Sequence, residues 1–167
     1  IGKELGVDFK VIKASLESFS GVFRRFEVKY NKEILVVDDY AHHPTDVAAT
    51  LNGIRAGWDR RLTVVFQPHL YSRTRDFYQE FSRAFLNSDV FICTDIYPAR
   101  ELPIEGITGD LIASTTKKFG HKNVHYVADK NNVPALLNEI KKNDDIVITM
   151  GAGDIWKYGE KFVAMLN

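Results

Sequence analysis

Short runs of β-branched and apolar residues recur along the chain from Ile34 onward, and longer, more polar segments separate them. Such runs, bounded by turn residues, are typical of strands. Their alternation with helical segments predicts β-α-β units and hence a parallel sheet. The predicted strands are residues 34–38, 62–66, 90–94, 124–127 and 146–149.

Between these runs, apolar residues return every three or four positions, which is the spacing of one helix face. Each stripe is expected to pack on the sheet. The stripes are Val47, Leu51, Ile54 and Trp58; Phe77, Phe81 and Phe85; and Val133, Leu137 and Ile140. Helix starts are indicated by Pro44, by Asp46 and Asp76 as first-turn acids, and by Asp154 after two glycines. The pattern predicts an α/β fold: a Rossmann-like, open, mostly parallel sheet with helices on both faces.

Residues 1–20 lack this pattern and indicate a helix end, a glycine-containing link and a second short helix. The segment VFRRFEVKYNKEILVVDD then predicts two strands that form a hairpin or bend through residues 30–32. The chain starts in mid-pattern and without methionine, which predicts that it is part of a longer protein. We therefore expect one full domain, residues 22–167, preceded by a short helical segment, residues 1–21.

Composition narrows the possible partners. An apolar content of 45% and an aromatic content of 12% are globular values, and 22 basic residues balance 22 acidic ones. Without a net field, neither nucleic acid nor a membrane is an expected partner. The single cysteine, Cys93, lies in an apolar run and is expected to be buried and inert. Together with the lack of a signal peptide or long apolar span, it favours a cytoplasmic protein.

Polar segments follow four of the predicted strands. They are DDYAHHPTD after the first, QPHLYSRTRD after the second, DIYPARE after the third and GAGD after the fifth. In an open parallel sheet the ligand crevice lies at the carboxyl ends of the strands, so all four segments share one edge. Solvated loops that cap helices account for some of these residues. A functional site accounts better for one group, namely His42, His43, His69, Tyr71 and Arg73.

Two site types fit this edge less well. A metal site lacks the usual spacings, because there is no HExxH, CxxC or His-x-His, and we predict no bound metal in this chain. A dinucleotide site would need a third glycine where GAGDIWKYG has Trp156, so a turn for close helix–strand approach is favoured. No GxxxxGK[ST] phosphate loop occurs either. An oxidoreductase or a binding-only nucleotide or amino acid module stays open.

Five motifs together resemble one family, the ATP-dependent Mur ligases, and within it the branch that adds L-alanine to UDP-N-acetylmuramate. They are RRFE, DDYAHHPT, FQPHLYSRT, IYPARE and GAGD, in the family's order and spacing over residues 24–154. The resemblance implies that residues 22–167 are the C-terminal, Rossmann-like, amino-acid-binding domain. Residues 1–21 are then the tail of the central ATPase domain or a linker.

The chemistry implied by the resemblance is amide-bond ligation in peptidoglycan biosynthesis. The lactyl carboxylate of UDP-N-acetylmuramate takes the γ-phosphoryl group of ATP, and the amine of L-alanine attacks the acyl phosphate. The cofactor is ATP with Mg²⁺, and the metal is held mainly by the central domain. Because that domain and the UDP-sugar site lie elsewhere, the chain alone is expected to be inactive.

The resemblance also assigns residues to the two sides of the site. Arg25 and Asp39 are implied in nucleotide binding, Arg25 across the domain junction and Asp39 at the ribose. The implied catalytic set is Arg25, Asp39 and His42.

The L-alanine site is implied to be lined by Tyr40, His42, His69 and Arg73. Arg73 pairs there with the carboxylate of the amino acid in a planar fork that lysine cannot copy. Two neighbours receive structural roles: His43 packs under the loop, and Asp38 caps backbone amides.

The sequence departs from the family pattern at one position. Relatives often carry arginine after the histidine of QPH, where this chain has Leu70. Leu70 cannot make a second arginine contact to a carboxylate or phosphate, which leaves either Arg73 alone or Arg75 as its substitute. The alternative within the family is the murein-recycling ligase, which adds a tripeptide to the same acceptor and carries a different segment in place of QPHLYSRT.

Overall fold

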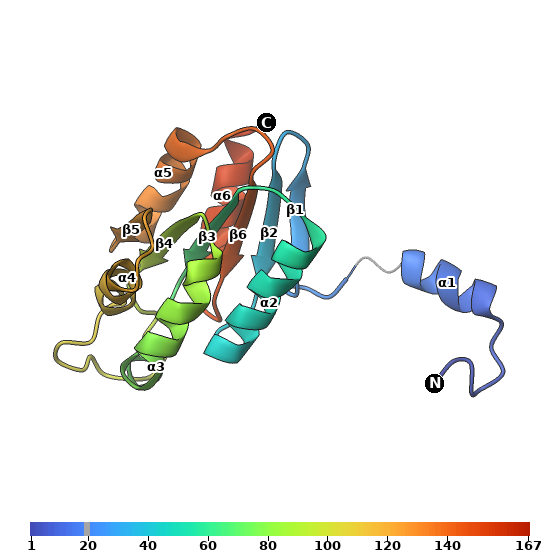
Figure 1. Ribbon diagram of the computed structural model, residues 1–167, viewed down its shortest axis with the longest axis horizontal. Helices are drawn as coiled ribbons and strands as arrows, with labels where there is room; N and C mark the ends of the chain where they lie inside the picture. Colours follow the sequence, from blue (N-terminus) through green and yellow to red (C-terminus); the bar gives the residue numbers. More distant parts are fainter. Residues whose placement is uncertain (19–20) are drawn as a thin grey trace.

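A computed structural model describes residues 1–18 and 21–167. Six strands form one sheet in the order β1-β2-β6-β3-β4-β5 (Figure 1). The antiparallel strand β1 pairs with β2, and every other neighbouring pair is parallel. The strands are β1 Glu27–Asn31, β2 Leu35–Asp39, β3 Leu62–Phe66, β4 Val90–Thr94, β5 Val124–Val127 and β6 Ile146–Met150.

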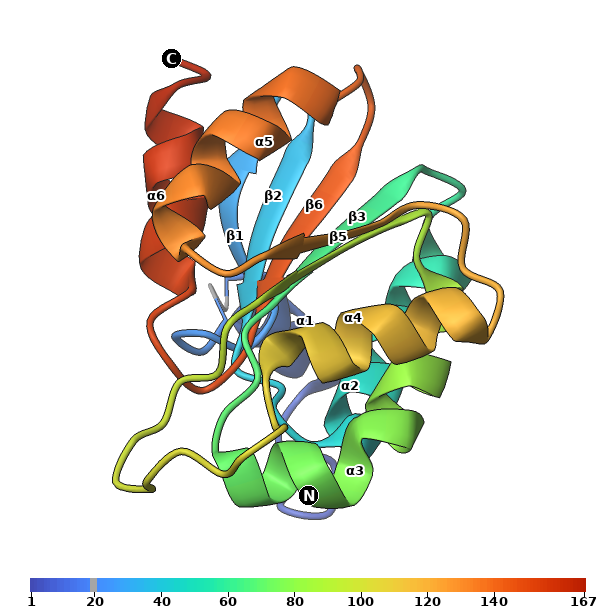
Figure 2. The same ribbon diagram turned by 90° about the vertical axis from the view of Figure 1, so that its left-hand side faces the viewer.

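The helices cover both faces of the sheet (Figure 2). Helices α2 (Pro44–Gly57), α3 (Tyr71–Ala84) and α4 (Gly109–Lys118) pack on one face, and α5 (Val133–Ile140) and α6 (Trp156–Ala164) pack on the other. Because side chains alternate along a strand, each strand feeds both cores. In β6, for example, Ile148 belongs to the first core and Val147 to the second.

The chain crosses from β2 to β3 over the position that β6 later fills, so β6 lies between them at the centre of the sheet. Strands β4 and β5 then extend the sheet on the far side of β3 before the chain returns to form β6. The carboxyl ends of β2, β3 and β6 therefore lie side by side. A crevice at such a point is where open α/β sheets bind ligands.

The predicted fold class is confirmed, and all five predicted strands are present within one residue of their expected ends. Val47, Leu51, Ile54, Phe81, Phe85, Val133 and Leu137 are buried as expected. Cys93 is also buried, and burial raises the pKa of its thiol well above the usual range. The predicted burial is thus confirmed, and the raised pKa disfavours the reactive thiolate form.

Three local predictions differ from the structure, and one helix has no predicted counterpart. Trp58 follows the end of α2 and is 38% exposed, because α2 stops at Gly57. Asp76 is not in the first turn of α3, since that helix starts five residues earlier at Tyr71. The hairpin turns at residues 32–34, because Tyr30 and Asn31 still pair with β2. Helix α4 is not among the predicted apolar stripes, and its sequence GDLIASTTKK is rich in threonine, serine and glycine.

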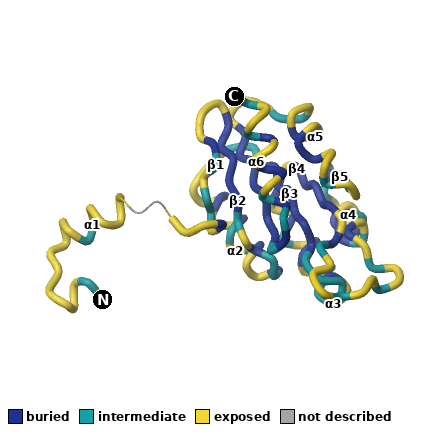
Figure 3. The backbone as a smooth tube through the Cα atoms, turned by 180° about the vertical axis from the view of Figure 1, so that it is seen from behind, coloured by how far each residue is buried: buried dark blue, intermediate teal, exposed yellow. Residues whose placement is uncertain are grey.

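The N-terminal segment contains one helix, α1 (Phe9–Glu17), which lies away from the sheet (Figure 1). Asp8 caps it by accepting a hydrogen bond from the Lys10 amide at 2.7 Å. None of its nine residues is buried, and Figure 3 shows the exposed segment. Residues 19 and 20, within the predicted 1–21 segment, lie outside the described residues. Among the described residues, no helix is both long and apolar enough to cross a membrane.

Candidate functional site at the carboxyl edge of the sheet

The strand ladders bring three of the polar segments together. Asp39 at the end of β2 and Phe66 at the end of β3 both pair with Met150 at the end of β6. Just beyond, the Gly151 amide donates to the Asp39 carbonyl at 3.2 Å, and the Gln67 amide donates to the Met150 carbonyl at 3.0 Å. The segments that follow these strands therefore begin side by side at one edge of the sheet, as the sequence predicts.

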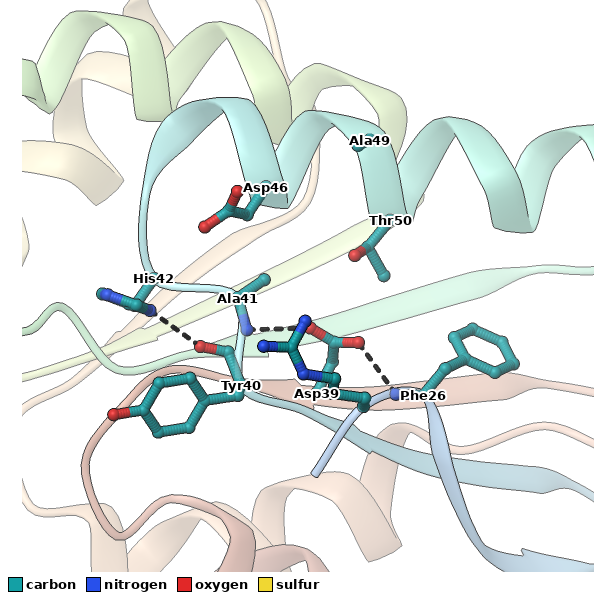
Figure 4. Close-up of a pocket in the computed structure, with 9 residues that line it drawn as sticks. Phe26, Asp39, Tyr40, Ala41, His42, Asp46, Ala49 and Thr50 are labelled. Carbon is teal, nitrogen blue, oxygen red and sulfur yellow. Dashed lines mark hydrogen bonds between the residues drawn. The ribbon is translucent and has the colours of Figure 1, made fainter. Parts of the chain in front are cut away.

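A cavity of about 520 Å³ opens between the end of β2 and the start of α2 (Figure 4). Its walls combine a cation, two carboxylates and aromatic rings with small side chains. The lining residues are Arg25, Phe26, Asp39, Tyr40, Ala41, His42, Asp46, Ala49 and Thr50. Four of the six predicted site residues, Arg25, Asp39, Tyr40 and His42, line this one cavity.

Asp39 is held at the floor of the cavity by backbone amides. Its Oδ2 accepts from the Phe26 amide at 2.9 Å, and its Oδ1 accepts from the Ala41 amide at 2.8 Å (Figure 4). Each carboxylate oxygen has a second lone pair, so the group can still accept hydrogen bonds from a ligand. Asp39 therefore organises the loop and faces the cavity at the same time.

Arg25 is the exposed cation of the cavity. Its side chain forms no hydrogen bond or ion pair with any of the described residues. Its neighbours Arg24 and Phe26 have φ values of 57° and 49°, in the left-handed region that side chains rarely adopt. Such a turn is costly, and persists where the surrounding structure holds it, as it does at functional sites.

A second group of residues extends the cavity toward α3. The His42 ring contacts Tyr40 at a centroid distance of 5.0 Å and His69 at 6.1 Å, and His69 stacks on Tyr97 at 5.7 Å. Arg73 reaches toward the same loop, with its Nη1 3.5 Å from the His42 carbonyl. At that distance the contact is weak, so the guanidinium retains its donors for another partner.

His69 lies in an environment that favours the neutral imidazole. Burial lowers the pKa of His69, and the positive charge of Arg73 and the nearby His42 lower it further. Its Nδ1 is buried without a hydrogen-bond partner among the described residues. The ring is thus held by stacking rather than by hydrogen bonds. A neutral imidazole can accept a proton or a hydrogen bond.

The prediction for Asp38 is wrong. Asp38 does not cap backbone amides: its Oδ2 accepts from Arg24 Nε at 2.9 Å, and its Oδ1 accepts from the Thr149 hydroxyl at 2.7 Å. Its side chain is 1% exposed, and burial raises the pKa of Asp38 against the opposing effects of Thr149 and Arg24. The run of acids in DDYAHHPTD suggests a loop cap, whereas Asp38 is still inside β2.

His43 has the packing role expected of it. Its ring meets Phe77 edge-on at a centroid distance of 5.1 Å. It is also the N-cap residue of α2, where its Nδ1 faces the Thr45 amide at 3.4 Å. The adjacent histidines therefore have different neighbours: His42 contacts Tyr40 and His69, whereas His43 contacts Phe77.

The glycine turn after β6 allows close packing, as predicted. Gly151 has a φ of 140°, and a Cβ there would lie 2.6 Å from the Gln67 carbonyl oxygen. At Gly153 a Cβ would lie 2.3 Å from Gln67 Oε1. Gln67 Oε1 also accepts from the Asp154 amide at 2.9 Å. Only glycine lets the turn come this close to β3.

The YPARE segment supports the start of α3. Glu101 accepts from the Ser72 amide at 2.9 Å and from its hydroxyl at 2.5 Å. Ser72 lowers the pKa of Glu101 through these bonds. Leu70 donates its amide to the Tyr97 carbonyl at 3.0 Å, with a φ of 74°. A carboxylate near the first amides of a helix is favourable, so this segment fixes the helix that carries Arg73.

Sequence reasoning missed Arg24, which is buried at the base of this site and bound to Asp38. The available signal is the pair of arginines in RRFE, of which the resemblance gives a role only to Arg25. Within residues 1–18 and 21–167, no group of three or more His, Cys, Asp or Glu side chains is placed to hold a metal ion.

Comparison with known proteins identifies the class. Residues 24–153 match the family model "Mur ligase, glutamate ligase domain". This span includes the site described above, from Arg24 to the glycine turn. The chain therefore belongs to the Mur ligase family of glutamate ligase domains.

Curated relatives carry a more specific name. The UDP-N-acetylmuramate--L-alanine ligase of Geotalea uraniireducens is 52% identical over 168 residues, which is 100% of this chain and 37% of that protein. The enzyme of the same name from Salinibacter ruber is 48% identical and is covered to 36%. The chain thus spans a little over a third of the length of these relatives.

Solved structures agree on the fold. The UDP-N-acetylmuramate-alanine ligase of Thermotoga maritima superposes with a TM-score of 0.80 at 25% identity, covering 99% of this chain and 35% of that one. A murein peptide ligase from Psychrobacter arcticus superposes with a TM-score of 0.71 at 22% identity, covering 99% and 34%. At that identity the second match shows the fold alone.

Proposed function

We propose that this chain is the amino-acid-binding, C-terminal part of an ATP-dependent ligase that joins L-alanine to UDP-N-acetylmuramate. The observation that carries the proposal is the cavity in which Arg25, Asp39, Tyr40 and His42 meet beside His69 and Arg73. Relatives about half identical over the whole chain, named for this reaction, support the choice of substrates.

The nucleotide side of the site is formed by Arg25 and Asp39. Arg25 is an exposed cation suited to the phosphates of ATP, and Asp39 can accept hydrogen bonds from the ribose hydroxyls through its spare lone pairs. A cavity of about 520 Å³ has the size of an ordinary small-molecule site. We place the Mg²⁺ that accompanies ATP mainly in the central domain.

The amino acid side is formed by Tyr40, His42, His69 and Arg73. The guanidinium of Arg73 pairs with the carboxylate of L-alanine in two parallel hydrogen bonds. His69, held neutral, offers an acceptor to the amino group, which must lose a proton before it can attack. Tyr40 and His42 form the wall between the two sides, because both line the cavity and their rings touch.

The reaction places most of its demand on positioning and charge. ATP phosphorylates the lactyl carboxylate, the amine of L-alanine attacks the resulting acyl phosphate, and phosphate leaves. Holding the amine against the acyl carbon accounts for much of the rate, since orientation alone can lower a barrier by roughly 7–11 kcal/mol. Fixed cations then stabilise the negative charge that develops on phosphoryl and carbonyl oxygens.

We assign residues 22–167 to the C-terminal domain, and residues 1–21 to the tail of the central ATPase domain or to a linker. The partners of the whole enzyme are ATP, L-alanine and UDP-N-acetylmuramate, in the cytoplasm. The murein-recycling ligase, the family alternative, would need room for a tripeptide where L-alanine binds. By itself, without the central domain, this chain would act only as a module that binds a nucleotide or an amino acid.

The proposal is tested with the full-length protein that carries this domain. Phosphate release from ATP is measured with UDP-N-acetylmuramate and either L-alanine or the tripeptide, in parallel with the isolated chain. We expect release that depends on L-alanine in the full-length protein and none in the isolated chain. Preference for the tripeptide would favour the recycling ligase, and L-alanine-dependent release by the isolated chain would contradict the domain assignment.

A further inference from the structure

The side chain of Arg24 lies buried beneath the turn that carries Arg25. Its Nε donates to Asp38 at 2.9 Å, its Nη1 donates to the Gly153 carbonyl at 3.1 Å, and its Nη2 donates to the Gly151 carbonyl. The guanidinium also lies over the Tyr40 ring, 5.0 Å from its centroid. One side chain, 8% exposed, therefore joins parts of the protein more than a hundred residues apart.

These partners belong to the segments that form the cavity. Asp38 is in β2, immediately before Asp39, and its second oxygen accepts from Thr149 at 2.7 Å in β6. Gly151 and Gly153 form the turn after β6, and Tyr40 is a wall residue of the cavity. The guanidinium thus fixes the strand ends and the wall relative to one another.

The backbone of the same turn is held from both sides. The Arg24 amide donates to Glu27 Oε2 at 2.9 Å, and its carbonyl accepts from the Tyr40 amide at 2.6 Å. The Phe26 amide donates to Asp39. Arg25 therefore lies between two anchored residues. Arg24 is hydrogen-bonded to Tyr40, and Phe26 is hydrogen-bonded to Asp39.

Stability alone is a weak reason for such an arrangement. Burying an ion pair costs desolvation that its attraction often fails to repay, and apolar side chains of similar volume stabilise as well or better. A planar group with fixed donor directions does, however, define geometry in a way that apolar packing does not. A buried arginine under a cavity is thus better explained by geometry than by stability.

We infer that Arg24 is a positioning residue, which fixes the spacing between the nucleotide side of the cavity (Arg25 and Asp39) and its amino acid side (Tyr40 and His42). The inference rests on the proposed function. Lysine in place of Arg24 keeps the positive charge but has a single nitrogen, which cannot reach Asp38 and both glycine carbonyls in these directions. Arg24→Lys therefore removes the geometry and retains the charge.

The opposite edge of the sheet offers a matched control. Arg61 Nη1 donates to Asp145, which is fully buried, at 2.7 Å and to the Ile140 carbonyl at 3.2 Å. Arg61 immediately precedes β3, so this pair lies at the amino edge, away from the cavity. Arg61→Lys disturbs a comparable arginine–aspartate pair without touching the site.

The test compares Arg24→Lys and Arg61→Lys in the full-length protein, at a temperature where circular dichroism shows both folded. The values of kcat and of KM for L-alanine and ATP are measured. We expect both variants to lower the Tm, but only Arg24→Lys to lower kcat/KM for L-alanine, by tenfold or more. Arg61→Lys should stay within twofold of the wild type. Wild-type kinetics in folded Arg24→Lys would overturn the inference.

A second measurement needs no variant and no activity. In the wild-type domain, NMR should show hydrogen exchange at Arg24 Nε at least tenfold slower than at the exposed Arg25. Equal exchange would show that the buried contacts do not form, and would overturn the inference even if Arg24→Lys failed to fold. Failure of the proposed function is distinct, because the wild-type enzyme would then lack L-alanine-dependent turnover while the slow exchange persisted.

Discussion

The carboxyl and amino edges of the sheet each place an arginine against a buried aspartate, but the surroundings of the two pairs differ. At the amino edge, Arg61 and Asp145 lie next to Arg60, which donates to the carbonyls of Asp144 and Asp145 at 2.7 and 3.0 Å. These bonds join the residues just before β3 to those just before its neighbour β6. At the carboxyl edge, Arg24 and Asp38 lie beneath a cavity.

Backbone strain separates the edges as well. Among the described residues, the non-glycine positions with positive φ are Arg24, Phe26, Leu70 and Ala99 at the carboxyl edge and Asp144 at the amino edge. Strain of this kind persists where surrounding contacts enforce it, which is common at functional sites. Four of these five positions thus lie at the carboxyl edge, as expected if the proposed binding site is there.

The largest expected effect of a substitution is at Arg73. Arg73→Ala in the full-length enzyme should lower kcat/KM for L-alanine. The loss of transition-state stabilisation should be roughly 2–5 kcal/mol, because the substrate carboxylate is left unpaired in a closed site. At the amino edge, Arg60→Ala is the control and should change kcat/KM little. Steady-state kinetics with varied L-alanine decide the matter, and equal losses in both variants would remove the distinction between the edges.

A second effect concerns stability at the carboxyl edge. A Cβ at Gly109 would lie 2.0 Å from the Thr94 carbonyl oxygen, so Gly109→Ala should lower the free energy of unfolding by about 3 kcal/mol. Gly53 in α2 has nothing within 4 Å of its Cβ position. Gly53→Ala should therefore raise stability by about 0.5–1 kcal/mol. Urea unfolding of both variants tests this, and equal midpoints would contradict it.

The nucleotide side gives a smaller and more selective effect. Arg25→Ala should raise the KM for ATP about tenfold, or about 1.4 kcal/mol, and change the KM for L-alanine less. Asp39→Ala should do the same and also lower the Tm, because the Phe26 and Ala41 amides lose their acceptor. Equal changes in both Michaelis constants would place these residues elsewhere in the mechanism.

The smallest effect depends on pH and lies outside the cavity. His121 Nε2 contacts the Ser88 carbonyl at 2.9 Å, and its Nδ1 accepts from the Asn123 amide at 3.1 Å. Burial lowers the pKa of His121 in the folded state. The unfolded chain, with a pKa of about 6.5, therefore binds the proton first as pH falls.

The stability contributed by neutral His121 is thus present above about pH 6.5 and is lost as pH falls through the lowered folded pKa, by at most about 1.4 kcal/mol per pH unit. Urea unfolding at pH 7.5 and 5.5 should show a steeper loss in the wild type than in His121→Gln. Parallel losses in the two proteins would mean that His121 titrates alike in both states. His69, whose pKa is also lowered, contributes equally to both proteins.

The same contrast between the edges shows what the sequence can predict. The strands follow from runs such as Leu62–Phe66, because a strand buried on both faces favours apolar residues at nearly every position; Thr63 is the exception in this run. The gathering of polar loops follows from parallel topology alone. Parallel topology therefore suffices to predict that residues 38–46 and 67–76 lie at one edge.

The features that the sequence does not predict depend on contacts between distant residues, which leave no periodic pattern in the sequence. Arg24 looks like any surface arginine in the sequence, and only the packing of β2, β6 and the glycine turn buries it. The role of Glu101 at the start of α3 joins residues 29 positions apart, which a linear pattern does not show. Helix α4 buries only Ile112 and Ala113 of its apolar residues in the core and approaches β4 closely at Gly109, which leaves no long apolar stripe in the sequence to predict it from.

The central claim, that the carboxyl edge binds the carboxylate of L-alanine through the fork of Arg73, is tested most directly by Arg73→Lys. This substitution keeps the charge and removes the paired hydrogen bonds. Steady-state kinetics of the full-length enzyme are measured with L-alanine varied at saturating ATP, and with ATP varied at saturating L-alanine. We expect the KM for L-alanine to rise at least about tenfold and the KM for ATP to stay nearly unchanged. An unchanged dependence on L-alanine would show that Arg73 is only a surface residue of α3.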